Sequence, residues 1–283
     1  MREIESFWDL VPHYDGFLFD AYGVLVDDSE VIPGAIAVWK GLADRGKPAW
    51  IVTNGSSRSL AQAARSYTEK GLPVHPEQII NSAGLLGSYF AEAELRGLKT
   101  AVLGTAASVD YVREAGGIPV SALDDDFEVL VVANQTEFPL LETLDAVLSR
   151  ILQRVAAQQP CHLVLANPDL IYPKDKTRFG ITAGALAVLL EAALSARLGP
   201  EAPRFVRLGK PHGRIFAEAV RRSGSRRLLM IGDQLETDIR GAVDFGLDSL
   251  LMGTGLIDWP NLTREQLVPA PTYLLRAWSP ACS

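Results

Sequence analysis

Gly16-Phe17-Leu18-Phe19-Asp20-Ala21-Tyr22-Gly23-Val24-Leu25 is the stretch of the chain that decides the fold. Small and apolar residues lead without interruption to a single carboxylate, and a glycine follows shortly after it. An apolar run of this kind predicts a parallel strand that is buried on both faces. Ligands of open α/β sheets bind at the carboxyl ends of such strands. Asp20 is therefore a candidate nucleophile, although the pattern also fits an ordinary connection between a strand and a turn.

Three later stretches repeat this form, a strand that ends in polar residues. They are Ala49-Trp50-Ile51-Val52 before Thr53-Asn54-Gly55-Ser56-Ser57, Arg207-Leu208-Gly209 before Lys210-Pro211, and Leu228-Leu229-Met230-Ile231 before Gly232-Asp233-Gln234-Leu235-Glu236-Thr237-Asp238. The chain thus carries, in order, an aspartate, a hydroxyl group beside backbone amides, a lysine and a pair of carboxylates. This order resembles the four motifs of the haloacid dehalogenase-like hydrolase superfamily.

Further motifs narrow the resemblance to one branch of that superfamily. They are Ile32-Pro33-Gly34-Ala35, Asn167-Pro168-Asp169 with Tyr172-Pro173, and Gly209-Lys210-Pro211. These motifs are similar to those of class IIA, the nitrophenylphosphatase- and sugar-phosphatase-like branch, and the resemblance covers nearly the whole chain. It implies an α/β fold with a Rossmann-like, doubly wound parallel sheet as its core and a smaller α/β cap domain inserted between the second and third motifs.

The hydrophobic pattern is consistent with this organisation. Residues 1–80 and 206–283 are expected to form the core domain, residues 81–205 are expected to form the cap, and we predict hinges near Ser82 and Phe205. Within the cap the pattern predicts strands at 100–103, 129–133 and 162–166, and helices at 107–115, 140–157 and 182–196. In the core it predicts helices at 33–45 and 58–70, strands at 78–80 and 249–252, and an edge strand at 272–275.

The composition excludes several classes of protein. With 283 residues, of which 48% are hydrophobic, the chain can bury a sizeable core. Its formal charge of 27 minus 34, or −7, argues against a nucleic-acid partner. Residues 1–6 do not have the pattern of a secretory signal, and the most apolar helical run, 185–194, is short and interrupted by Glu191, so we expect a cytoplasmic protein without a membrane partner. Cys161 and Cys282 lie far apart and are expected to be free thiols. The sequence leaves open whether the protein is a homo-oligomer.

The resemblance implies phosphoryl transfer to a carboxylate. Asp20 would attack phosphorus and form an aspartyl phosphate, which is a known kind of covalent intermediate. Mg²⁺ prefers oxygen ligands in octahedral geometry. The expected ligands are Asp20, the backbone carbonyl of Tyr22 and Asp233, with Asp238 in direct or indirect contact. Without the resemblance, residues 232–238 could equally be the capped start of a helix.

The remaining motifs are expected to bind the substrate. A helix start that contains glycine and hydroxyl residues offers free backbone amides to an anion, although a serine N-cap without a ligand fits equally well. Thr53, the amides of Asn54 and Gly55, and Lys210 would hold phosphoryl oxygens. The resemblance implies that Asn167 and Asp169 of the cap contact the substrate; without it, Asn-Pro-Asp would be read as a turn.

Tyr22 departs from the pattern of the superfamily. Its phosphatases usually carry a second aspartate two residues after the nucleophile, as general acid and base. An unperturbed tyrosine has a pKa of about 10, and loss of a general acid or base typically costs about 10²–10⁴-fold in rate. Asp27 or Asp28 could replace the missing aspartate, although both fit a solvated loop.

Three functions therefore remain open. The protein could be a Mg²⁺-dependent hydrolase of small phosphate monoesters that is slowed by Tyr22, or a catalytically weakened protein that binds a phospho-ligand. It could also be a haloacid dehalogenase, because Phe19-Asp20-Ala21-Tyr22-Gly23 resembles the first motif of those enzymes. Asp233 and Asp238 argue against dehalogenation, because anionic groups without a cation would repel a carboxylate substrate.

Overall fold

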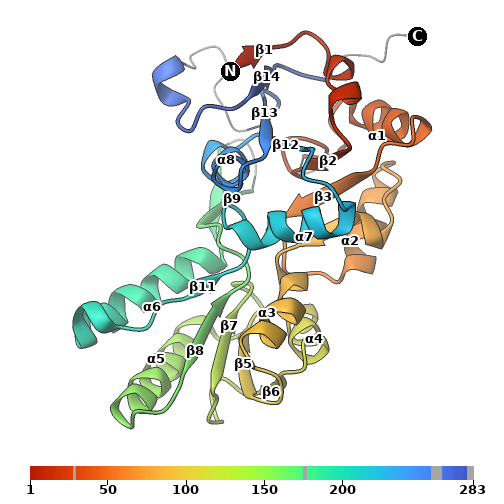
Figure 1. Cartoon of the computed structure of the whole chain (residues 1–283). Helices are drawn as coiled ribbons and strands as arrows, with labels where there is room; N and C mark the ends of the chain where they lie inside the picture. Colours follow the sequence, from red (N-terminus) through yellow and green to blue (C-terminus); the bar gives the residue numbers. More distant parts are fainter. Residues whose placement is uncertain (28–29, 175–176, 256–262, 279–283) are drawn as a thin grey trace. The chain divides into compact units, whose positions relative to one another are not determined.

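A computed structural model describes residues 1–27, 30–174, 177–255 and 263–278 (Figure 1). Its contacts divide the chain into two compact units. The first contains residues 1–53, 60–80 and 210–283, and the second contains residues 54–59 and 81–209. Six residues that directly follow Thr53 thus cluster with the second unit, although the first unit resumes at Leu60.

The first unit is built on a seven-stranded sheet with the order β1-β14-β13-β12-β2-β3-β4. The strands are β1 (Arg2–Glu3), β2 (Gly16–Phe19), β3 (Ala49–Thr53), β4 (Ile79–Asn81), β12 (Leu228–Gly232), β13 (Asp248–Met252) and β14 (Tyr273–Leu275). All pairings from β1 through to β3 are parallel.

Strand β2 lies where the order of the strands reverses. It is flanked by β3, the next core strand along the chain, and by β12, which comes much later. Phe19, the last residue of β2, pairs with Ile51 on one side and with Ile231 on the other. The crevice outside the carboxyl ends at such a reversal is where open α/β sheets bind ligands.

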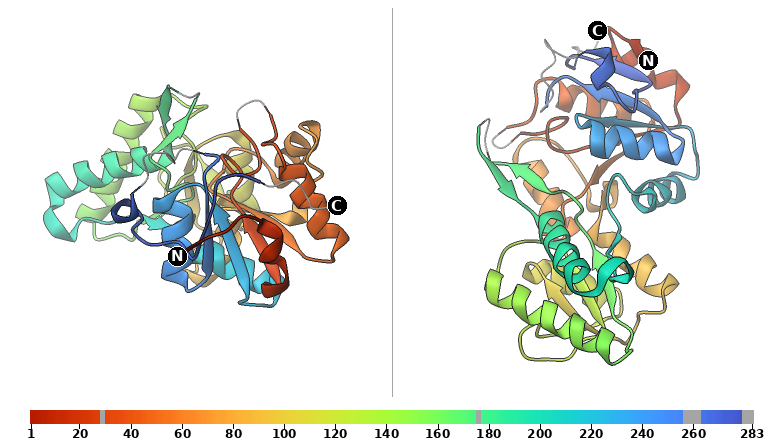
Figure 2. Two further views of the ribbon diagram at one scale, coloured as in Figure 1. Left: turned by 90° about the horizontal axis from the view of Figure 1, so that it is seen from above. Right: turned by 90° about the vertical axis from the view of Figure 1, so that its left-hand side faces the viewer.

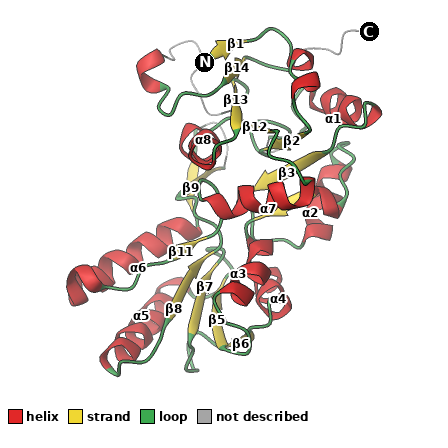
Figure 3. Cartoon of the chain, viewed as in Figure 1, coloured by secondary structure: helices red, strands yellow, loops and turns green. Residues whose placement is uncertain are grey.

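Helices cover both faces of this sheet, and Figure 3 shows them beside the strands. Side chains of α1 (Ala35–Asp44) and α2 (Leu60–Glu69) share one apolar cluster with Leu250 and Met252 of β13. Leu251 lies between these two in the strand, so it points to the opposite face, where it packs on Ile239. Ile239 directly precedes α8 (Arg240–Phe245), which contacts α7 (Gly213–Ser223). The predicted doubly wound core is confirmed.

The second unit has its own parallel five-stranded sheet, with the order β11-β8-β7-β5-β6, and an antiparallel hairpin. The strands are β5 (Lys99–Leu103), β6 (Ile118–Val120), β7 (Val129–Val132), β8 (His162–Leu165) and β11 (Val206–Arg207), and the hairpin is β9 (Ile171–Pro173) with β10 (Phe179–Ile181). The helices are α3 (Leu86–Glu92), α4 (Ala106–Glu114), α5 (Leu140–Ala156) and α6 (Ala183–Leu198). Side chains of α5 and α6 share one apolar cluster with the sheet, whereas α4 contacts β5, β6 and α3. Figure 2 shows α5 in green and α6 in teal in two further views.

Two strands differ from their expected places. Val206–Arg207 was expected in the core, but it forms β11 and pairs with β8 of the second sheet, beside the buried Phe205. Strand β14 is not at the edge of the core sheet, because β1 pairs with it on its outer side. Both errors arise from two-residue strands, whose partners no hydrophobic pattern can specify.

Helix α6 and the turn after it, Ala183–Glu201, are long and apolar enough to cross a membrane by length and composition alone. The helix nevertheless packs as a core helix: Leu186, Leu190 and Leu194 are buried in the apolar cluster of the second unit.

The carboxylate of Glu191, which lies in the same helix, is also buried and serves as an anchor. It accepts hydrogen bonds from the Phe205 amide at 2.8 Å and from the Arg207 guanidinium at 2.7 Å, and Arg204 lies 3.7 Å away. Burial alone would raise the pKa of Glu191, but the bonds from Arg207 and Phe205 outweigh it and lower the pKa below its usual value. The end of the second unit is therefore tied to α6.

We expect Glu191→Gln to lower the free energy of unfolding by about 1–3 kcal/mol at pH 7, because Arg207 loses its charged partner. Since the folded pKa is lowered, the stabilisation by Glu191 is complete above the unfolded pKa of about 4.3 and is lost as the pH falls through the folded pKa. Urea unfolding of the variant and the parent should show a gap that is widest at pH 7 and narrows below about pH 4.3. The exposed Glu114→Gln in α4 is the control and should show no such gap; a gap for Glu191→Gln that is independent of pH would contradict the role of its charge.

Candidate active site

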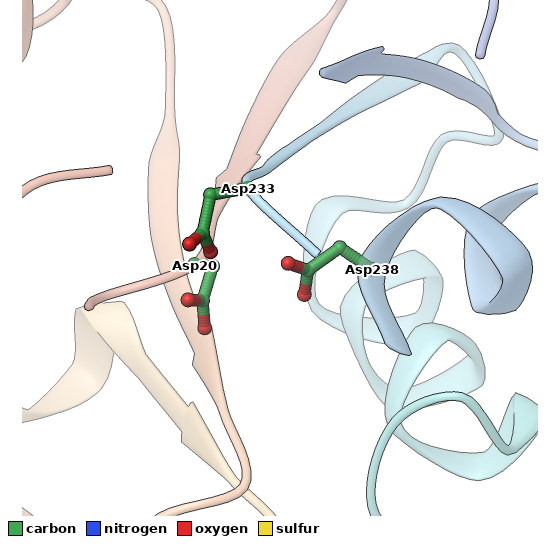
Figure 4. Close-up of side chains that lie close together, drawn as sticks. All are labelled: Asp20, Asp233 and Asp238. Atoms are coloured by element: carbon green, nitrogen blue, oxygen red, sulfur yellow. The ribbon is translucent and has the colours of Figure 1, made fainter. Parts of the chain in front are cut away.

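Three carboxylates of the first unit gather at the carboxyl ends of its central strands. Asp20 directly follows β2, Asp233 directly follows β12, and Asp238 lies in the π-helical turn Leu235–Ile239 before α8. Each contributes an oxygen to a group of atoms that all lie within 4.8 Å of one another (Figure 4). All three side chains are buried. Since Asp20 N donates to Ile231 O at 2.8 Å, the loop that begins at Asp20 is aligned with the end of β12.

Lys210 belongs to the same cluster. Its ammonium donates to Asp20 Oδ1 at 2.5 Å and to Asp238 Oδ1 at 2.6 Å, and only 3% of the residue is exposed. Burial alone would lower the pKa of Lys210, but the charges of Asp20 and Asp238 raise it above its usual value. Burial raises the pKa of Asp238, against the attraction of Lys210. One ammonium cannot neutralise three ionised carboxylates, and buried charge without a counterion is costly.

The donor set fits a divalent cation. Three carboxylates against one ammonium leave a formal charge of −2 when all are ionised. All the ligand atoms are oxygens, which is the preference of Mg²⁺ and Ca²⁺. Asp20, Asp233 and Asp238 are therefore the described residues that could hold such an ion, with Tyr22 two positions after Asp20 in the loop.

Glycines make room for these carboxylates. A Cβ atom on Gly23, where φ is +79°, would lie 2.4 Å from Asp233 Oδ2, and one on Gly255 would lie 1.9 Å from the same oxygen. Thr254 Oγ1 also donates to Gly23 O at 2.6 Å, so the residues after β13 hold the loop after β2. Sequence reasoning missed Gly255 and Thr254, although Gly253-Thr254-Gly255 follows a buried strand in the same way as the four recognised motifs.

The loop after Asp20 is tight. Gly23 N donates to Val26 O at 2.8 Å, and Tyr22 forms an isolated bridge with Val26. Asp27 is exposed, and its Oδ1 accepts a hydrogen bond from Glu30 N at 2.8 Å, as in a solvated turn. Asp28, the other suggested substitute for the missing aspartate, lies outside the described residues.

The predicted phosphate- and substrate-binding residues divide between the two units. Thr53 ends β3, beside β2, in the first unit, whereas Asn54, Gly55, Asn167 and Asp169 belong to the second. Asn54 Nδ2 donates to Asp169 Oδ1 at 2.8 Å, and Asp169 N donates to Asn167 Oδ1 at 3.0 Å. The Asn-Pro-Asp tripeptide is therefore the turn that its composition suggests, and it also holds Asn54.

A polar cavity of about 540 Å³ lies within the second unit beside this turn. Its lining residues are mostly hydroxyl, amide and charged side chains: Gly55, Ser57, Arg58, Thr105, Asn134, Gln135, Thr136, Glu137, Asn167, Asp169, Tyr172 and Thr182. A cavity of this size and polarity suits a small hydrophilic molecule. Five of them belong to motifs recognised in the sequence: Gly55, Ser57, Asn167, Asp169 and Tyr172. The others had not been singled out, because they come from separate segments of the chain.

Comparison with known proteins identifies the family. The family model described as haloacid dehalogenase-like hydrolase matches residues 17–118, and a second, HAD-hydrolase-like, matches residues 207–277. A crystal structure of a possible sugar phosphatase of the HAD superfamily from Cytophaga hutchinsonii has 31% sequence identity and a TM-score of 0.82, and the match covers 98% of both chains.

Two further relatives are similar over most of their length. A dihydroxyacetone phosphatase from Corynebacterium glutamicum is 26% identical, over 92% of this chain and 88% of its own. The crystal structure of a glycerol phosphate phosphatase from Mycobacterium tuberculosis in complex with magnesium has 26% identity and a TM-score of 0.79, over 95% of this chain and 76% of its own. The chain belongs to the haloacid dehalogenase-like hydrolase superfamily, in the class IIA branch with a large α/β cap. It is thus a hydrolase of a family whose named relatives here are phosphatases.

We expect Gly255→Ala to displace the Asp233 carboxylate, because the added methyl group would overlap Asp233 Oδ2. Overpacking of this kind costs about 1–3 kcal/mol, measurable as a lower melting temperature. Gly87→Ala is the matched control, since a Cβ on Gly87 in α3 meets nothing within 4 Å and alanine favours the helix. A crystal structure of the Gly255→Ala variant with Asp233 unmoved would contradict the expectation.

Proposed function

We propose that the protein is a Mg²⁺-dependent phosphatase of small phosphate monoesters that acts through an aspartyl phosphate on Asp20. The observation that carries the proposal is the buried cluster of Asp20, Lys210, Asp233 and Asp238 at the point where the strand order of the core sheet reverses. Phosphoryl transfer is catalysed mainly by positioning and by charge neutralisation, which is what these groups offer.

In this proposal each residue of the site has its own role. Asp20 attacks phosphorus, and the bond from phosphorus to the ester oxygen breaks as the bond to Asp20 forms. Lys210 holds Asp20 in place and neutralises charge on the phosphoryl oxygens, together with the Thr53 hydroxyl and the amides of Asn54 and Gly55. Asp20, the carbonyl of Tyr22, Asp233 and Asp238 would hold Mg²⁺, which supplies positive charge for the phosphoryl group.

The polar cavity is proposed to bind the alcohol part of the substrate. Hydroxyl and amide groups at its walls, Asn167 among them, suit a leaving group that carries several hydroxyls. The named relatives act on dihydroxyacetone phosphate and glycerol phosphate, which are esters of this kind. A small hydroxylated phosphate ester is therefore the proposed substrate class.

We expect hydrolysis of phosphate monoesters to require Mg²⁺. Chelation by EDTA should abolish turnover, and Asp233→Asn should lower kcat/KM by at least about 10²-fold, because a charged metal ligand is lost. A screen of phosphate monoesters and 2-haloacids, with and without Mg²⁺, measures this beside an Asp20→Asn control. Undiminished hydrolysis of a 2-haloacid in excess chelator would instead identify a dehalogenase, the alternative that Tyr22 favours. Binding of phosphate without turnover of any ester would identify a ligand-binding protein.

Tyr22 generates a kinetic prediction. The first half-reaction needs only a good leaving group, whereas hydrolysis of the aspartyl phosphate needs an activated water molecule, for which tyrosine is a poor base near neutral pH. We expect p-nitrophenyl phosphate to give a rapid burst of nitrophenol followed by a slow steady state, observable by stopped-flow absorbance.

Tyr22→Asp should then raise the steady rate, whereas Tyr22→Phe, which removes only the hydroxyl, should leave it unchanged. The gain requires that the smaller side chain leaves no disabling cavity, which a melting curve of the variant checks. If the parent shows no burst and Tyr22→Asp no gain, another group performs the acid/base step.

A further inference from the structure

The six residues that follow β3 are held by buried hydroxyl groups of the second unit. Ser82 Oγ donates to Asn54 O at 2.9 Å, and Ser108 Oγ donates to Ser56 O at 3.0 Å. The donors to the next two carbonyls, those of residues 57 and 58, are Thr105 Oγ1 at 2.9 Å and Tyr111 OH at 3.1 Å. All four donor residues are buried. The backbone of residues 54–59 is therefore fixed by the cap, although Thr53 belongs to the core sheet.

The side chain of Asn54 adds a further restraint at the start of this segment. It is 4% exposed, and its Nδ2 donates to Asp169 Oδ1 at 2.8 Å. A Cβ atom on Gly209 would lie 2.3 Å from Asn54 Oδ1, so the amide fits closely against the residue that precedes Lys210. Only glycine at position 209 leaves room for this arrangement.

Asp169 is itself held in a fixed position. Its backbone N–H donates to Asn167 Oδ1 at 3.0 Å, and its carbonyl accepts from Gly184 N at 3.0 Å near the start of α6. A Cβ on Gly184 would lie 2.4 Å from the same carbonyl, so the turn and the helix are in close contact. Through Asp169, Asn54 is thus anchored to a helix of the apolar core of the cap.

We propose that Asp169 is a positioning residue: by holding the side chain of Asn54 it fixes the backbone amides of Asn54 and Gly55 that bind the phosphoryl group. This inference rests on the proposed function and differs from the sequence-based expectation that Asp169 contacts the substrate. Loss of a residue that positions phosphate-binding amides should weaken the binding of every phosphate ester, and of inorganic phosphate, by a similar factor. A residue that contacts the leaving group changes the preference among esters instead.

The test compares Asp169→Ala with the conservative Asp169→Asn in the full-length protein with Mg²⁺. We expect Asp169→Ala to raise KM for p-nitrophenyl phosphate, glycerol phosphate and a hexose phosphate by a similar factor, about tenfold, because a hydrogen bond to a charged group is lost. The inhibition constant of inorganic phosphate should rise by the same factor. Asp169→Asn keeps an oxygen that accepts from Asn54 Nδ2, so it should stay within about threefold of the parent.

Two further variants serve as controls. Asn54→Ala removes the same hydrogen bond from the other side. The KM and the phosphate inhibition constant of the Asn54→Ala/Asp169→Ala double variant should therefore rise no further than those of either single variant. Thr136→Val removes one hydroxyl from the cavity and should change the ratio of kcat/KM values among the three esters, with the inhibition constant of phosphate unchanged. Thermal melts show whether Asp169→Ala folds. If it does not, the inhibition constant of phosphate measured for Asp169→Asn still tests the inference.

The outcomes separate the two proposals. A changed preference among esters in Asp169→Ala, with an unchanged constant for phosphate, would show that Asp169 contacts the leaving group and would overturn the inference alone. Unchanged kinetics in Asp169→Ala, or additive losses in the double variant, would overturn it as well. If the parent protein neither hydrolyses any of the esters nor binds phosphate in a calorimeter, the proposed function fails and the inference fails with it.

Discussion

The ion pairs of Lys210 with Asp20 and Asp238 are the interactions on which the rest of the core depends. A buried carboxylate without a counter-charge is costly, and the ammonium of Lys210, 2.5 Å from Asp20 Oδ1, supplies that charge. The three charged groups come from positions 20, 210 and 238, so their contact requires β2 and β12 to be paired. The site therefore depends on the central strands of the core, although residues 81–209 of the second unit separate the two parts of the core in sequence.

The core strands could be predicted because each is an apolar run that ends in a polar residue. Positions 16–19, 49–53 and 228–232 are buried strands, and parallel pairing places their carboxyl ends at one edge. Local pattern was insufficient for β1 and β11, since a two-residue strand has too few side chains to show a period. Their places are set by pairing with β14 and β8, partners that lie more than 40 residues away along the chain.

The charged residues of the site were predictable for the same reason, whereas the residues that arrange them were not. Gly255 matters only because Asp233 Oδ2 occupies the space that its Cβ would fill, and this is a fact of three-dimensional packing. The hydroxyls that hold residues 54–59 come from Ser82, Thr105, Ser108 and Tyr111, and single hydroxyl residues carry no signal in the sequence. For Asp169 the sequence supported both a place in a turn and a contact with the substrate. The structure adds a hydrogen bond from Asn54 that neither interpretation contained.

The assignment of residues 54–59 to the second unit changes how such a cap can be exchanged between relatives. The chain passes between the two units at 53/54, 59/60, 80/81 and 209/210, whereas a simple insertion would need only two junctions. A chimera that replaces only residues 81–209 would keep the host's hexapeptide, whose carbonyls would then face a foreign set of hydroxyl donors. We therefore expect recombination between relatives to exchange residues 54–59 together with residues 81–209, although the core helix α2 separates these two stretches in sequence.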